Sequence, residues 1–83
     1  MIEYVIIGGG GAGRTVLGAC AQLENKVGFL DDHATAREIN RVPVLGNVAA
    51  RANYRDAQFI IAFGNRYQRA RRDLFEQMTA EGY

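Results

Sequence analysis

The chain has 83 residues, of which 48% are hydrophobic and 23% are charged, and its formal net charge is +1. A chain of this length forms a single domain, and this composition excludes a disordered or low-complexity protein. The nearly balanced charge gives no general electrostatic reason to bind nucleic acid or an anionic membrane, and no apolar run approaches the length of a membrane span.

Residues 2–7 form an apolar run interrupted only by Glu3, which is typical of a strand buried on both faces of a parallel sheet. Residues 8–13 contain five glycines and predict a tight turn. Gly18 falls inside the helical pattern that follows, and it costs about 1 kcal/mol relative to alanine. We therefore expect this helix to approach the sheet closely. Its predicted apolar face consists of Val16, Leu17, Ala19, Cys20 and Leu23.

Residues 26–30 predict a second strand, and the polar segment 33–41 predicts a surface loop. Val42–Gly46 predicts a strand near the edge of the sheet, because Pro43 cannot donate to an internal ladder. Asn47 is expected to cap a helical turn that reaches residue 51 or 52.

Residues 58–63 predict a further strand, which is followed by an amphipathic helix. The apolar face of that helix is predicted to consist of Tyr67, Ala70, Leu74, Phe75 and Met78.

This alternation of strands and helices predicts an α/β fold over the single domain 1–83. Right-handed crossovers favour a small Rossmann-like parallel sheet flanked by helices, with the first strand in its centre. Numbered in chain order, the four predicted strands should lie in the order 3-2-1-4.

The glycine-rich turn is the clearest functional signal. Gly8, Gly10 and Gly13 match the pattern GxGxxG directly after a predicted strand and directly before a predicted helix. Glycine lets the backbone approach a ligand closely, and the N-terminus of a helix offers unpaired N–H groups to a phosphate. The alternative is a turn that merely connects two elements.

Asp31 and Asp32 follow the second predicted strand, where dinucleotide-binding folds place an acid that binds ribose hydroxyls. Neighbouring side chains on an extended segment point in opposite directions, so this pair is not expected to share a proton. A solvated loop is the alternative interpretation. His33 has no recognisable catalytic partners and is expected on the surface.

Gly64 and Asn65 follow the last predicted strand at the same edge of the sheet, although Asn65 could equally cap the final helix. Arg66 and Arg69 lie near the N-terminus of that helix, where the helix dipole disfavours cations and a bound anion would compensate. The helix is expected to turn further charged residues toward solvent, namely Arg71, Arg72, Asp73 and Glu76.

The segments IIGGGGAGR, VGFLDD, VPVLG and IAFGNRYQR, in this order, resemble the N-terminal domain of bacterial sugar acetyltransferases of the PglD/NeuD type. The resemblance implies a Rossmann-like domain that holds a UDP-sugar. In the family, this domain is joined to a left-handed β-helix that binds acetyl-CoA, supplies the catalytic histidine and assembles as a trimer. The present chain has no hexapeptide repeats, so we expect no catalytic residue in it and no activity from it alone.

The same resemblance implies a nucleotide-sugar site in this chain, with the diphosphate on the glycine loop and the uridine near the aspartates. The family often has a histidine at the position of Ala12, so a polar contact from that side chain is absent here. The implied site residues are Gly8, Gly10, Gly11, Ala12, Gly13, Arg14, Asp31, Asp32, Gly64, Asn65 and Arg69.

The expected ligand is thus a UDP-sugar, with acetyl-CoA bound only through another domain, and no metal, nucleic acid or membrane is expected as a partner. Self-association is left open. Glu3 and the absence of a basic leader argue against a secretory signal and predict a cytoplasmic protein. The alternatives are an NAD or adenine-nucleotide module, or a non-binding module that oligomerises through Tyr67, Phe75 or Met78.

Overall fold

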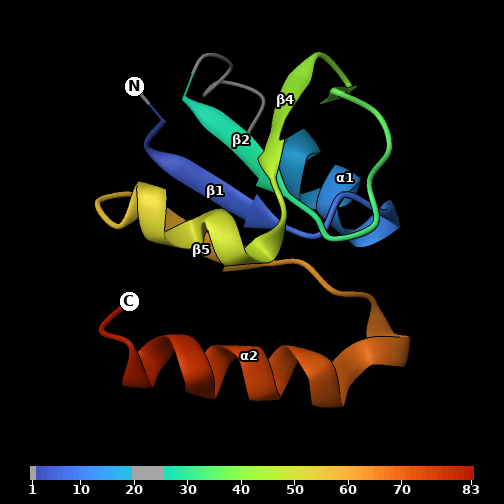
Figure 1. Ribbon diagram of the computed structural model, residues 1–83. Helices are drawn as coiled ribbons and strands as arrows, with labels where there is room; N and C mark the ends of the chain where they lie inside the picture. The colour runs from blue at the N-terminus through green and yellow to red at the C-terminus, as the bar shows by residue number, and fades with distance from the viewer. Residues whose placement is uncertain (1, 20–25) are drawn as a thin grey trace.

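A computed structural model describes residues 2–19 and 26–83 of the chain (Figure 1). No helix in these two ranges is both long enough and apolar enough to cross a membrane. The elements are, in chain order, β1 (Tyr4–Ile7), α1 (Gly11–Ala19), β2 (Val27–Leu30), β3 (Glu38–Ile39), β4 (Val42–Gly46), the 3-10 helix η2 (Val48–Tyr54), β5 (Gln58–Ile61), the 3-10 turn η3 (Asn65–Tyr67) and α2 (Gln68–Ala80).

The mixed α/β class is confirmed: the five strands form one sheet in the order β3-β4-β2-β1-β5, flanked by helices. Strands β1, β2, β4 and β5 run parallel, whereas β3 pairs antiparallel with β4. The observed strand order differs from the predicted one because an additional strand, β3, lies at the edge of the sheet next to β4. The four predicted segments themselves lie as β4-β2-β1-β5.

Strand β3 lies where we predicted a surface loop, and backbone conformation explains the error. Asn40 and Arg41 have φ angles of 51° and 70°. Two consecutive left-handed residues are the requirement for the tight hairpin turn that matches the twist of antiparallel strands. The turn folds Glu38 back beside Pro43, which therefore belongs to the second strand from the edge.

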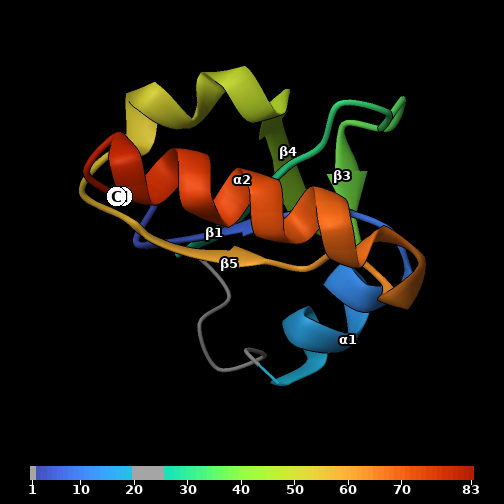
Figure 2. The same cartoon turned by 90° about the horizontal axis from the view of Figure 1, so that it is seen from below.

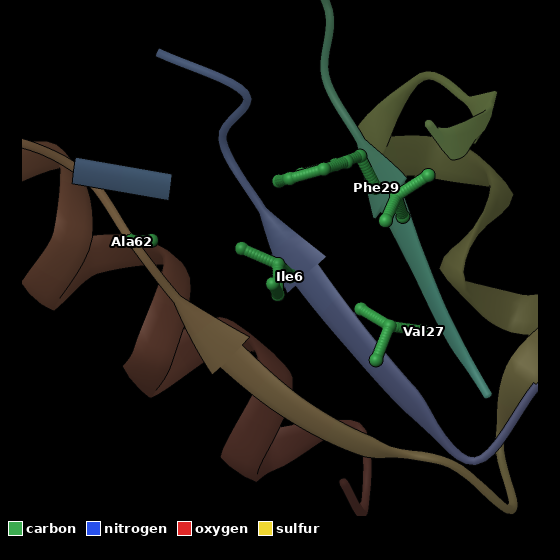
Figure 3. Close-up of a cluster of buried hydrophobic side chains, with 5 residues drawn as sticks. Ile6, Val27, Phe29 and Ala62 are labelled. Atoms are coloured by element: carbon green, nitrogen blue, oxygen red, sulfur yellow. The ribbon is translucent and has the colours of Figure 1, made fainter. Parts of the chain in front are cut away.

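The sheet buries side chains on both faces, as expected for a parallel sheet between helices. On one face, Ile6, Val27 and Phe29 form a cluster against which α1 packs (Figure 3). On the other face, Val5 and Leu30 belong to a second cluster, which α2 and η2 cover. Figure 2 shows α1 and η2 on opposite sides of the sheet.

Gly18 does not mark a close approach of α1 to the sheet, contrary to our prediction. A Cβ atom at this position would meet no atom of residues 2–19 and 26–83 within 4 Å, and the residue is exposed. The helix packs instead through Ala12, Val16 and Leu17. The predicted face residues Cys20 and Leu23 lie outside the described residues.

The predicted apolar face of α2 is only partly correct. Met78 is buried and Leu74 packs beside it, whereas Phe75 is 62% exposed and Tyr67 is 57% exposed. Tyr67 belongs to the preceding 3-10 turn, so its position does not follow the phase of the helix. Phe75 is one residue away from the Leu74–Met78 line and is therefore rotated by about 100° around the helix.

The C-terminal end of α2 is joined to η2 by polar contacts. The Arg51 guanidinium donates to both carboxylate oxygens of Glu81, at 3.1 and 3.0 Å. Arg55 donates to the Glu81 carbonyl oxygen at 2.7 Å and lies 4.3 Å from the centre of the Tyr83 ring. These contacts fix the C-terminal end of α2 against η2.

Glu81→Gln is expected to lower the Tm modestly and to flatten its dependence on pH. The hydrogen bonds from Arg51 hold the pKa of Glu81 below its ordinary value. The resulting stability is present above the unfolded-state pKa and is lost as the pH falls through the folded-state pKa. Thermal unfolding between about pH 6 and about pH 3 should therefore show a larger fall in Tm for the wild type than for the variant. Equal slopes would contradict the pairing.

Glu76→Gln provides the matched control for that experiment. Glu76 is exposed on α2, the helix that ends just before Glu81, and has no ion pair within residues 2–19 and 26–83. Its removal should leave the slope of Tm against pH as it is in the wild type.

Candidate functional site at the carboxyl edge of the sheet

The parallel strands bring the predicted site segments to one edge of the sheet. The Gly8 N–H donates to the Leu30 carbonyl at 2.9 Å, and the Asp31 N–H donates to the Gly46 carbonyl at 3.0 Å. On the other side of β1, the Ala62 N–H donates to the Ile7 carbonyl at 2.8 Å. The glycine loop, the aspartates and the segment after β5 therefore meet at the carboxyl edge, where open α/β sheets bind their ligands.

Two glycines of the GxGxxG pattern are required by backbone packing. Gly8 has a φ of +106°, and a Cβ atom there would lie 2.8 Å from the Ala62 carbonyl oxygen. A Cβ atom on Gly13 would overlap the Gly8 carbonyl oxygen. The start of α1 thus lies directly against the loop that precedes it, which only glycine permits.

Gly10 and Gly11, in contrast, face open space. A Cβ atom on either residue would meet none of the described residues within 4 Å, and both residues are exposed. These two positions are where a ligand can approach the backbone.

The first turn of α1 presents unpaired N–H groups. The Arg14 N–H donates to the Gly10 carbonyl at 3.0 Å and starts the hydrogen-bonding pattern of the helix. Within the described parts of the chain, the N–H groups of residues 10–13 have no acceptor. The first turn also contains no acidic side chain. These groups and the positive end of the helix dipole form a geometry that favours an anion.

Ala12 contributes to this turn through its backbone alone. Its methyl group packs against the cluster around Ile6 and Phe29. Arg14, two residues further along the same turn, is exposed and makes no ion pair with the described residues.

Both aspartates bind backbone groups, a role that sequence reasoning missed. Asp31 Oδ2 accepts from the Gly9 N–H at 2.6 Å, and Asp31 Oδ1 accepts from the His33 N–H at 2.7 Å. Asp32 Oδ1 accepts from the N–H of Val48, the first residue of η2, at 2.7 Å. The sequence could have indicated the bond to His33, since an aspartate at the end of a strand readily accepts a hydrogen bond from the backbone N–H two residues later.

The segment after β5 supplies exposed polar groups. Gly64 precedes η3, and neither η3 nor α2 has a side-chain cap, so the interpretation of Asn65 as a helix cap is wrong. Asn65 and Arg69 are exposed. Asn47, by contrast, caps η2 as predicted, and accepts from the Ala50 N–H at 3.2 Å.

A groove lies apart from these residues, between β5 and α2, and none of the predicted site residues lines it. Arg71 and Arg72 face it, rather than pairing with the acidic residues of their own helix. The lining is completed by Phe59, Ile61, Gln68, Phe75, Met78, Thr79 and Tyr83.

The fold and the site define an open α/β domain whose glycine loop and helix N-terminus are exposed at the carboxyl edge of the sheet. The family model of the PglD N-terminal domain matches residues 3–78, and the chain belongs to this family. The resemblance of the sequence to that domain is thereby confirmed, and it associates the chain with sugar acetyltransferases. No curated protein matches the sequence.

Proposed function

We propose that the chain is the domain of a sugar acetyltransferase that binds a UDP-sugar. The observation that carries the proposal is the row of N–H groups of residues 10–13, which have no acceptor among residues 2–19 and 26–83, in a chain of the PglD N-terminal domain family. A diphosphate is the part of the ligand that such a row suits, because each oxygen can accept from the backbone without a side chain in between.

The remaining parts of the ligand would lie along the same edge. Asp32 is exposed, and its Oδ2 accepts no hydrogen bond from the described residues, which suits a ribose hydroxyl or the uracil base. Asn65 begins η3 and Arg69 is the second residue of α2, so both exposed side chains follow the carboxyl end of β5, and we assign them to the phosphate and the sugar.

The contribution of such a domain to acetyl transfer is positional. Binding of the nucleotide end fixes the amino or hydroxyl group of the sugar relative to the thioester of acetyl-CoA, which another domain would hold. Remote binding energy is thereby converted into orientation of the reacting groups.

Calorimetric titration with UDP, a UDP-amino sugar, NAD and ATP tests the proposal. We expect both uridine nucleotides to bind more tightly than NAD or ATP. Both carboxylate oxygens of Asp31 are bonded to backbone N–H groups, so the acid that binds the adenosine ribose at this position in NAD-binding folds is already engaged here. Tighter binding of NAD than of every uridine nucleotide would overturn the proposal.

A further inference from the structure

We propose that Asp31 is a positioning residue, which holds the glycine loop in the conformation that receives a diphosphate. The inference rests on the proposed function. Asp31 Oδ2 accepts from the buried Gly9 N–H at 2.6 Å, and Oδ1 accepts from the His33 N–H at 2.7 Å. The carboxylate therefore joins the end of β2 to the middle of the glycine loop.

The backbone N–H groups of the loop fall into two sets, one bonded to the end of β2 and one without an acceptor among the described residues. The Gly8 N–H donates to the Leu30 carbonyl, and the next N–H, that of Gly9, donates to Asp31. Both donors turn toward the end of β2. The N–H groups of residues 10–13 have no acceptor within the described residues and are left for a ligand. Asp31 thus fixes the N–H of Gly9, which directly precedes the N–H groups of residues 10–13 that would bind the anion.

Gly9 also lies close to an apolar side chain. A Cβ atom on Gly9 would overlap the Ile39 Cδ1 atom and would lie 3.0 Å from Asp31 Oδ2. The carboxylate of Asp31 and the side chain of Ile39 on β3 therefore both lie close to Gly9. Loss of the carboxylate leaves a buried N–H without an acceptor, and the loop must change conformation to pair it.

Electrostatics alone predicts the opposite result, which makes the inference testable. The negative charge of Asp31 repels a diphosphate on the same loop, so a purely electrostatic role means that its removal tightens binding. A positioning role means that its removal weakens binding, because only a fraction of the molecules then has a competent loop. The direction of the change distinguishes the two roles.

The experiment compares Asp31→Ala and Asp31→Asn by calorimetry with UDP and with uridine. We expect Asp31→Ala to weaken UDP binding about tenfold and uridine binding less than about twofold. The reason is that the glycine loop would contact the diphosphate, which uridine lacks. Asp31→Asn keeps an oxygen for the Gly9 N–H and should restore most of the UDP affinity. Asp56→Ala removes an exposed carboxylate in the turn before β5 and should leave both affinities unchanged.

Unchanged or tighter UDP binding by Asp31→Ala would overturn the inference while leaving the proposed function intact. If the wild type binds no uridine nucleotide, the proposed function fails, and the positioning role is decided on the unliganded protein. Amide hydrogen exchange at residues 9–13 should then be faster in Asp31→Ala than in the wild type or Asp56→Ala. Equal exchange in all three proteins would overturn the inference.

Discussion

Phe29→Ala is expected to destabilise the protein by about 3–5 kcal/mol. Phe29 is fully buried at the centre of the cluster that α1 covers, together with Ile6 and Val27. The whole stability of a chain of this size is about 4–12 kcal/mol, so the variant should lose much of its folded population. Urea unfolding followed by far-UV circular dichroism measures the change.

Phe75→Ala is the matched control, because Phe75 is 62% exposed on α2. Truncation at an exposed position should change the free energy of unfolding by no more than about 0.5 kcal/mol. A loss as large as that of Phe29→Ala would mean that Phe75 belongs to the core, as the helical pattern in the sequence predicted.

Gly13→Ala is expected to cost about 1–3 kcal/mol and to displace α1 from the glycine loop. The added methyl group would overlap the Gly8 carbonyl oxygen, which is a backbone atom and cannot rotate away. Gly8 itself is held by its hydrogen bond to Leu30. The displacement should appear as changed amide chemical shifts along α1, and the cost as a lower urea midpoint.

Gly18→Ala tests the same substitution elsewhere in α1. Gly18 is exposed, and a Cβ atom there would meet nothing within 4 Å in the part of the chain that the structure describes. Alanine is the better helix former, so this variant should gain about 0.5–1 kcal/mol. Destabilisation by both variants to the same degree would show that the contact between Gly13 and Gly8 is not the cause.

The central strands could be predicted from the sequence because a strand that is buried on both faces has a continuous run of apolar residues. The apolar runs at β1 and β2 have no alternation, and both strands are buried inside the sheet. The antiparallel β3 could not be predicted in this way. It is two residues long, and its turn uses Asn40 and Arg41 at positive φ without the glycine that normally signals such a turn.

The sequence was sufficient to locate the candidate site in the fold, but not to predict which contacts each of its residues makes. GxGxxG between a strand and a helix locates the loop, because connectivity alone determines which edge of the sheet it occupies. Which atoms each residue meets depends on tertiary packing. Gly13 lies against Gly8, Ala12 turns its methyl group to the core, and Asp31 binds the Gly9 N–H.

The sheet separates α1 and the glycine loop from the outer side of α2, and this separation has a practical use. Glu76 is exposed on α2, and α2 packs on the face of the sheet that α1 does not cover. A linker attached at position 76 would immobilise the domain on a sensor chip with the carboxyl edge of the sheet still open to the flowing solution.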